Sequence, residues 1–531
     1  MMEDRGGGKP GSAPGGRPAE DTLLPDPEVM RRLGYRAVDH VVERWAGLEA
    51  DRPWQSATRA AAEAALDGPA PEEGGDVEAL MERAVREIFP LAGRIDHPRF
   101  MGFVPSSPGW PAILADILVS GHNVFQGTWL ESAGPSQIEL TVLEWFREWL
   151  GMPEGASGIL TSGGSVANLL AVVAARDLAG APPGGVIYLS EQGHSSLERA
   201  ARVAGFPPER IRKLPTGADR RLSPSQVAEA VARDRDSGLH PLLICANGGA
   251  TSTGVVDPLP ELAALARREG IRLHVDAAYG GFAILTPEGR EALAGIGEAD
   301  TVTLDPHKWF FQTYECGCLM ARDPEELERV FRVSAAYLQD TRLKDREVNF
   351  GDRGIQLTRA FRSLGIWLTV QSAGRRRLAE SIEAGIELGH RAEAWIRDHP
   401  ELELLHPASL GIVCFRYRPP AWEGGDLRGG GGAGRPSEAP SLEGGPDLPL
   451  VPLAPLDSLD SLDSPDSLEE ALESLNRTVQ DRILQGGHAM MSSTRLDGRY
   501  SLRFCILNHR TRWSHVEEAL EQVVREGRAL A

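Results

Sequence analysis

The chain of 531 residues has little lysine, little cysteine and no long apolar run. Only four of its 56 basic residues are lysines, namely Lys9, Lys213, Lys308 and Lys344. The five cysteines are too few and too scattered for a disulfide framework, so we expect a protein of the reducing cytoplasm. Cys316 and Cys318 have no second pair of ligands at zinc-like spacing, so we expect buried packing there and no metal site.

The chain has no apolar run long enough to span a membrane, and its negative net charge disfavours binding to nucleic acids. Stretches such as Leu169–Ala175 fall far short of the ~20 apolar residues that cross a bilayer. Residues 1–22 lack the apolar core of a signal peptide. The net charge of -20 disfavours phosphate backbones and anionic lipid surfaces. We therefore expect the partner to be a small molecule.

Composition and periodicity divide the chain into four parts. Residues 1–22, rich in glycine and proline, predict a disordered tail, and 23–108 predict an N-terminal helical segment. Residues 109–365 alternate short β-rich runs with helical ones, which predicts a large α/β domain with a mostly parallel sheet. Residues 366–531 predict a long helix and a small C-terminal α/β domain. Within it, the acidic, low-complexity run at about 421–475 predicts a disordered insertion without chemistry.

Three motifs in the large domain each fall at the end of a predicted strand. LTSGGSVANLL (160–170) runs from a strand end through glycines into a helix N-terminus, which can bind an anion. HVDAAYGG (274–281) ends a strand on Asp276, and TLDPHKWFF (303–311) ends the next on Lys308. A lysine pressed by apolar walls loses its proton more easily and becomes a nucleophile towards carbonyls.

Each motif taken singly has an ordinary structural explanation, such as a serine-capped turn or a buried structural acid. Together they supply a phosphate anchor, a carboxylate for a ring nitrogen and a lysine for a Schiff base, which predicts pyridoxal 5'-phosphate as the cofactor. His194, in LSEQGHSSLE (189–198), also follows a predicted strand and could stack on the cofactor ring.

These motifs resemble those of the group II pyridoxal-phosphate-dependent amino-acid decarboxylases, which include the aromatic-L-amino-acid, glutamate and histidine decarboxylases. The resemblance rests on TSGGSVAN, on HSS with His194, on HVDAAYGG and above all on DPHKW. Four further blocks match, namely HPRF (97–100), VPSSP (104–108), TRAFRSLGIW (358–367) and LRFCILNHRTR (502–512). The likeness covers about 27–420 and 476–525.

The resemblance implies a fold-type I, aspartate aminotransferase-like large domain and a homodimer with sites at the subunit interface. It makes Lys308 the Schiff-base lysine, Asp276 the partner of the pyridinium nitrogen and His194 the ring that stacks on the cofactor. The other implied cofactor contacts are Gly164, Ser165 and His307 at the phosphate, and Thr251 and Ala278 near the ring. Phe103 and Val104 are the implied substrate contacts.

The expected activity is decarboxylation of an L-amino acid to the amine and CO₂. The Phe103 and Val104 wall favours an aromatic or otherwise apolar substrate side chain. A carbon–carbon lyase on the same scaffold is an alternative, and so is a non-catalytic scaffold protein, although the intact Lys308, Asp276 and His194 speak against the latter.

Two positions depart from the animal aromatic decarboxylases. A gap-free count back from TRAFRSL places Phe350 where they carry a tyrosine that protonates the substrate carbon. Related enzymes with phenylalanine there form an aldehyde, CO₂, ammonia and hydrogen peroxide, so oxidative decarboxylation is a second alternative. A shifted alignment, or another proton donor such as Tyr337 or His194, would retain the amine product. Asp305 replaces an asparagine, and an acid beside a phosphate is unfavourable unless it points elsewhere.

Overall fold

The computed structural model describes residues 23, 25–55, 57–333, 340–341, 346–422 and 465–531. The predicted tail at 1–22 lies outside these residues, and so does Tyr337. Contacts divide the chain into two compact units, one made of Met1–Asp51 with Ser56–Ala92 and the other of Arg52–Gln55 with Gly93–Ala531.

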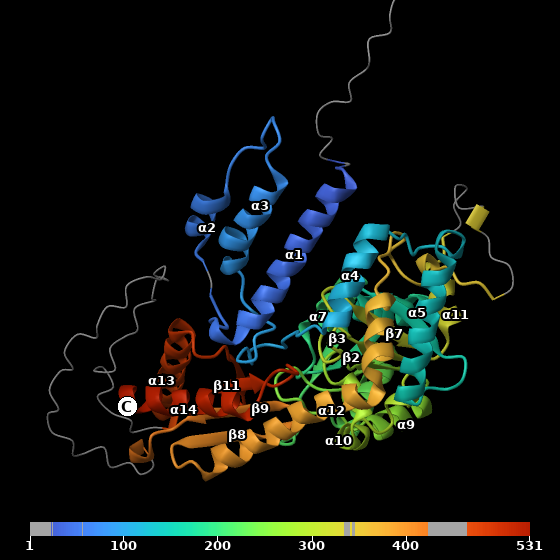
Figure 1. The fold of residues 1–531 in the computed structure, drawn as a ribbon. Coiled ribbons are helices and arrows are strands. Elements are labelled where there is room, and N and C mark those ends of the chain that lie inside the picture. Colours follow the sequence, from blue (N-terminus) through green and yellow to red (C-terminus); the bar gives the residue numbers. More distant parts are fainter. Residues whose placement is uncertain (1–22, 24, 56, 334–339, 342–345, 423–464) are drawn as a thin grey trace, which may run out of the picture. The chain divides into compact units, whose positions relative to one another are not determined.

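The first unit is helical, as predicted for the N-terminal segment, and is coloured blue in Figure 1. Its helices are α1 (Pro27–Gly47), α2 (Arg59–Leu66) and α3 (Val77–Arg83). Glu82 joins two of them, because its carboxylate accepts from Arg36 Nε at 2.8 Å. The predicted boundary at 108 is wrong, since 93–108 belongs to the second unit, where Met101 is fully buried in a core. Met101 packs against residues far away in the sequence, and the local pattern of apolar residues does not reveal such contacts.

The second unit contains a sheet of seven strands. They are β1 (Ser157–Thr161), β2 (Gly185–Ser190), β3 (Ile211–Leu214), β4 (His240–Asn247), β5 (Arg272–Asp276), β6 (Thr301–Leu304) and β7 (Gly317–Ala321). Their order is β1-β7-β6-β5-β4-β2-β3, and only the pairings of β7 with β1 and β6 are antiparallel. The prediction of a mostly parallel sheet is confirmed.

Helices cover both faces of this sheet, which explains why its strands are apolar without alternation. Ile187 and Leu243 face one core together with α6 (Gly164–Leu178) and α7 (Ser195–Val203). Their neighbours Tyr188 and Ile244 face the opposite core, to which α8 (Pro224–Asp236) and α9 (Leu259–Glu269) contribute. The strands therefore end in one layer, and the loops that follow their carboxyl ends lie together.

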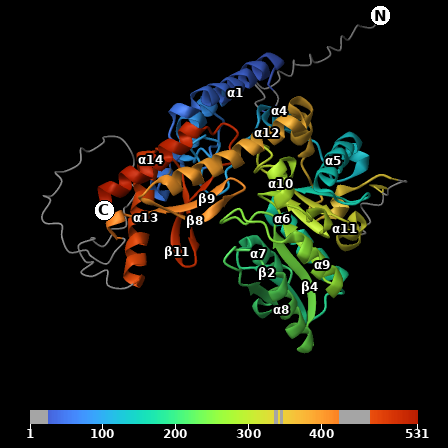
Figure 2. The same cartoon turned by 90° about the horizontal axis from the view of Figure 1, so that it is seen from below.

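The long helix α12 (Ser363–Asp398) joins the large sheet to a smaller one, as both views show (Figures 1 and 2). Ile382 lies in the core of the large sheet, whereas Ile396 lies in the core of the small one. The predicted domain boundary at 365 therefore separates two sheets that α12 holds in a single compact unit. The remaining helices of the large part are α4 (Trp110–His122), α5 (Trp129–Leu150), α10 (Pro287–Ala292) and α11 (Pro324–Phe331).

The small sheet has the order β10-β11-β9-β8 and is antiparallel throughout. Its strands are β8 (Leu402–Ser409), β9 (Ile412–Tyr417), β10 (Ser492–Leu496) and β11 (Arg499–Cys505), with helices α13 (Pro465–Gly486) and α14 (Trp513–Leu530). No helix in the described part of the chain is long and apolar enough to cross a membrane.

The predicted disordered insertion at 421–475 extends too far. Residues 423–464 lie outside the described part of the chain, but residues from 465 onwards form α13. Leu472 and Leu475 are each 1% exposed, and Leu475 and Val479 belong to the small-sheet core. The spacing of these apolar residues is typical of a helix. The prediction missed this helix because it relied on composition, which the preceding acidic repeats dominate.

Candidate active site

Loops at the carboxyl ends of β1, β2, β4, β5 and β6 enclose a cavity of about 340 Å³. All residues that the sequence assigned to the cofactor line it, namely Gly164, Ser165, His194, Thr251, Asp276, Ala278, His307 and Lys308. The cavity also contains residues that the sequence reading did not assign to the cofactor, namely Asn168, Ser196, Asn247, Tyr279, Asp305 and Glu315. The parallel sheet thus brings residues up to 153 positions apart (162 to 315) to one place.

The wall between β1 and α6 is shaped to bind an anion. Helix α6 begins at Gly164, so its first N–H groups and the positive end of its dipole face the cavity. A Cβ added to Gly164 would lie 2.9 Å from Asp305 Oδ2 and 3.1 Å from Ala278 Cβ, so only glycine leaves this wall open. Gly317 is equally constrained, because a Cβ there would lie 2.4 Å from the Cα of Gly163. Gly317, which lies between Cys316 and Cys318, therefore packs directly against the backbone of Gly163 in this wall.

Asp276 ends β5, and its carboxylate is held at both oxygens. Asn168 Nδ2 donates to Oδ2 at 2.8 Å, and the backbone N–H of Ala278 donates to Oδ1 at 3.2 Å. Asn168 is itself fixed, because its Oδ1 accepts from the Thr303 hydroxyl at 2.7 Å. Asp276 is 7% exposed, so a carboxylate held in this way offers a strong and oriented acceptor to a cationic ring nitrogen.

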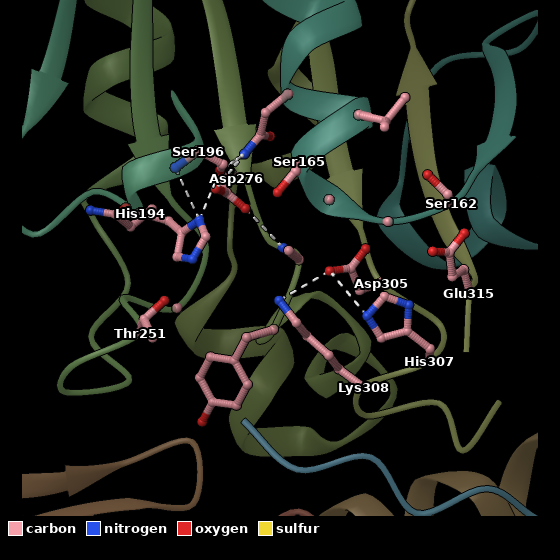
Figure 3. A pocket seen from close by; sticks show the side chains of 18 residues that line it. Ser162, Ser165, His194, Ser196, Thr251, Asp276, Asp305, His307, Lys308 and Glu315 are labelled. Carbon is pink, nitrogen blue, oxygen red and sulfur yellow. Dashed lines mark hydrogen bonds and ion pairs between the residues drawn. The ribbon is translucent and has the colours of Figure 1, made fainter. Parts of the chain in front are cut away.

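His194 is the N-cap of α7, and its Nδ1 lies 2.7 Å from the hydroxyl of Ser196. Ser196 Oγ also accepts from Asn168 Nδ2 at 2.9 Å, so Asn168 links the histidine to Asp276. Burial lowers the pKa of His194, although the charge of Asp276 opposes that effect. The ring is therefore neutral at pH 7. Figure 3 shows His194 beside Asp276 on the same wall of the cavity.

His274 lies behind Asp276 and is fully buried. Its Nε2 lies 3.0 Å from Asn168 Oδ1, and its Nδ1 lies 2.8 Å from the hydroxyl of Thr301. Burial lowers the pKa of His274 to about 4, against the opposing charge of Asp276. A neutral His274 that donates from Nε2 fixes the amide of Asn168 so that its NH₂ group points to Asp276.

Lys308 follows β6 and lies in an ion pair, with its Nζ 3.0 Å from Asp305 Oδ2. His307 Nε2 lies 3.7 Å from the same oxygen, and Figure 3 shows both side chains directed to Asp305. Burial alone would lower the pKa of Lys308, but the charges of Asp305 and Asp276 outweigh it and raise the pKa above its ordinary value. The expectation that apolar walls make this lysine lose its proton is therefore wrong, because its nearest charged neighbour is a carboxylate. Asp305 itself points towards Lys308.

The three predicted substrate residues do not line the cavity of this chain. Phe103 is 60% exposed, and Val104 is partly buried against the large core. Phe350 is fully buried in the same core, where the guanidinium groups of Arg359 and Arg353 lie 4.9 and 5.5 Å from its ring centre. A gap-free count gives a position in the chain, whereas the orientation of the side chain depends on contacts that the count does not contain.

Arg503 of β11 connects the small sheet to two of the predicted contact residues. Its guanidinium donates to the carbonyl oxygens of Thr251 at 2.5 Å and Phe103 at 2.6 Å. Nε donates to Ser252 O at 3.1 Å. This arginine positions the loop after β4. Sequence reasoning did not detect it, because 252 residues separate Arg503 from Thr251.

The cavity meets the requirements of pyridoxal phosphate in four respects. The glycine wall at the start of α6 has room for a phosphate, and a lysine, an oriented carboxylate and a neutral imidazole face the same space. The fold and the cavity together therefore define a pyridoxal-phosphate enzyme of fold type I.

The chain belongs to the pyridoxal-dependent decarboxylase family, whose conserved domain matches residues 60–418. It is 35% identical to an aromatic-L-amino-acid decarboxylase of Bacillus atrophaeus, covering 95% of this chain and 96% of that protein. It is also 28% identical to a phenylacetaldehyde synthase of Petunia hybrida, over 95% of each chain. The solved structure of Oryza sativa TDC with PLP and tryptamine superposes with a TM-score of 0.83 at 26% identity, covering 95% of this chain and 99% of that one. The cofactor is thus pyridoxal phosphate and the enzyme is a carboxy-lyase.

Proposed function

We propose that the protein decarboxylates an aromatic L-amino acid to the amine and CO₂. The observation that carries the proposal is the convergence of Lys308, Asp276 and His194 on one cavity beside an anion-binding helix start. The aromatic substrate class is supported by the relative from Bacillus atrophaeus and by the rice structure that holds tryptamine.

The residues of the cavity have distinct tasks in this reaction. Bound pyridoxal phosphate supplies a ring that withdraws the electron pair left when CO₂ departs. We assign the phosphate to the start of α6 with Ser165 and His307, which fixes one end of the site. Asp276 would hold a proton on the ring nitrogen, and the neutral imidazole of His194 would orient the ring. Lys308 would hold the cofactor covalently through its Nζ.

The substrate assignment is tested by supplying the common L-amino acids one at a time and measuring CO₂, amine, aldehyde and peroxide together. We expect turnover with tryptophan, tyrosine or phenylalanine, and amine as the product. Turnover confined to glutamate, or no CO₂ with any amino acid, would contradict the proposal.

An aldehyde-forming oxidative decarboxylation is the second candidate, and two observations favour it. A gap-free count places Phe350 at the position of the family's tyrosine, and the similar proteins include the phenylacetaldehyde synthase. The full burial of Phe350 weighs against it, because a ring in the core neither supplies nor withholds a proton at the cavity.

Phe350→Tyr separates the two candidates. With the ring in the core, we expect an unchanged ratio of amine to peroxide and a free energy of unfolding lower by about 1–3 kcal/mol, because the new hydroxyl is buried. Peroxide release and chemical denaturation measure the two effects. Peroxide from the wild-type protein that decreases in Phe350→Tyr would instead place this residue at the reacting carbon and favour the aldehyde.

We also propose a cytoplasmic homodimer with its sites at the subunit interface. All five cysteines are free and buried thiols, which suits a reducing compartment. Helix α4 exposes Leu114, Ile117 and Leu118, each at least 40% accessible, on one apolar stretch. The residue before α4, Gly109, donates to Phe311 O at 2.8 Å, so this surface adjoins the loop that carries Lys308.

Ile117→Asp is expected to convert the dimer to a monomer and to lower turnover at least ten-fold, because a charge in an apolar interface is desolvated without a partner. Sedimentation velocity measures the change in mass. Val203→Asp is the matched control, since Val203 is an exposed apolar residue on α7. A wild-type protein that sediments as a monomer would refute the assembly.

A further inference from the structure

Asp305 lies between the glycine wall and Lys308, at a position where the animal aromatic decarboxylases have asparagine. The residue is 2% exposed, and its Oδ2 forms the ion pair with Lys308. The other oxygen, Oδ1, is buried and has no hydrogen-bond partner within the described part of the chain. A buried carboxylate oxygen without a donor is destabilising, so folding alone gives no reason for an acid here.

We propose that Asp305 is the counter-ion and proton acceptor of Lys308, and that it makes the covalent capture of pyridoxal phosphate by Lys308 dependent on pH. The inference rests on the proposed function in one respect, because it takes Lys308 as the residue that reacts with the cofactor.

The charges around Lys308 leave Asp305 as its dominant partner. The other titratable groups of the described residues around it are Asp276 from β5, His194 at the start of α7, Cys505 from β11, and His307, Tyr314 and Glu315 from its own loop. Burial lowers the pKa of His194 and of His307, so both rings are neutral at pH 7. Asp276 is already held by Asn168 and Ala278. The contact of 3.0 Å to Asp305 therefore decides the protonation of Nζ.

Capture of the cofactor requires a neutral amine. The ammonium group of Lys308 first passes one proton to Asp305 Oδ2, and the nitrogen lone pair then adds to the aldehyde carbon. The two hydrogens left on Nζ depart with the aldehyde oxygen as water, and a carbon–nitrogen double bond remains. Because Asp305 stabilises the ammonium form, capture becomes favourable only as the pH rises.

Competitive acetylation with acetic anhydride tests the ion pair in the cofactor-free protein. Peptide mapping then gives the pKa of Lys308 separately from those of the other three lysines. We expect Asp305→Asn to lower that pKa by about one unit or more, as loss of an opposite charge within hydrogen-bond distance does. Asp305→Glu keeps the carboxylate and should stay close to the wild type. Asp234→Asn, which removes the carboxylate from the partly buried pair with Arg212, is the matched control and should leave Lys308 unchanged.

Capture itself is followed by the visible absorbance that develops when pyridoxal phosphate is added between pH 5.5 and 9. In Asp305→Asn, the midpoint of capture should move to lower pH by about the same unit or more. Asp305→Ser is a second neutral variant, in case the asparagine variant does not unfold cooperatively. An unchanged Lys308 pKa and an unchanged midpoint in either folded neutral variant would overturn the proposal. If the wild-type protein captures no cofactor on Lys308, the proposed function fails, whereas the acetylation result still decides the ion pair.

Discussion

Lys308→Ala protein is expected to hold no covalently bound pyridoxal phosphate and to turn over at least roughly a thousand-fold more slowly than the wild type. Lys308 is the only lysine that lines the described cavity. Lys213, in contrast, is exposed and paired with Glu198. Without Nζ, the chain would lack the amine that we propose as the covalent link to the cofactor.

Borohydride reduction followed by peptide mapping checks this assignment directly. Reduction fixes the cofactor to the nitrogen that holds it, so the wild-type adduct should be found on Lys308. Lys213→Ala is the matched control and should retain cofactor and turnover. An adduct on Lys9, Lys213 or Lys344, or none at all, would exclude Lys308 as the cofactor lysine.

Asp276→Asn is expected to lower kcat by roughly a hundred- to ten-thousand-fold while the protein stays folded. In the proposed role of Asp276, the carboxylate would keep the cofactor ring nitrogen protonated and an amide would not, so the ring would withdraw the developing electron pair less well. The new amide would turn its NH₂ either towards the NH₂ of Asn168 or towards the backbone N–H of Ala278, so one hydrogen bond is lost in either orientation, which should cost about 1–3 kcal/mol of stability.

Asn168→Ser separates positioning from chemistry at this site. It removes the donor to Asp276 Oδ2 and the link to Ser196, but it leaves the carboxylate in place. We expect a smaller loss of turnover than in Asp276→Asn, of about ten-fold, together with a shift in the visible spectrum of the bound cofactor. Steady-state kinetics and absorbance spectra measure both effects. Equal turnover of Asp276→Asn and the wild type would show that the ring nitrogen does not need this acid.

Which of the two variants, Asn168→Ser or Asp276→Asn, loses more turnover is as informative as the size of each loss. If Asn168→Ser were the more damaging change, the amide would be acting on the cofactor itself and not through Asp276. Thermal unfolding of both variants controls for simple loss of fold, since Asn168 and Asp276 are 1% and 7% exposed.

The sequence predicted which residues gather in the cavity, because each of them lies next to a local signal. Gly164, Asp276 and Lys308 all follow apolar runs that read as strands, and parallel strands bring their carboxyl ends to one edge. The sequence-based predictions were wrong where long-range packing decides whether a segment is ordered or where a side chain lies. The helix at 465–475 was taken as part of a disordered insertion, and Phe350 was expected at the substrate although the core encloses it.

The sequence by itself determined the fold class and the cofactor, and it predicts Lys308 as the reacting lysine, because all three depend on short motifs whose spacing is fixed by strand and helix geometry. The tertiary structure decided how those residues are charged and held. Only in three dimensions does Asp305 meet Lys308 and raise its pKa, and only there does Asn168 join Asp276 to His194. Protonation and orientation depend on distances of about 3 Å between side chains and on the burial around them, and local periodicity does not encode either.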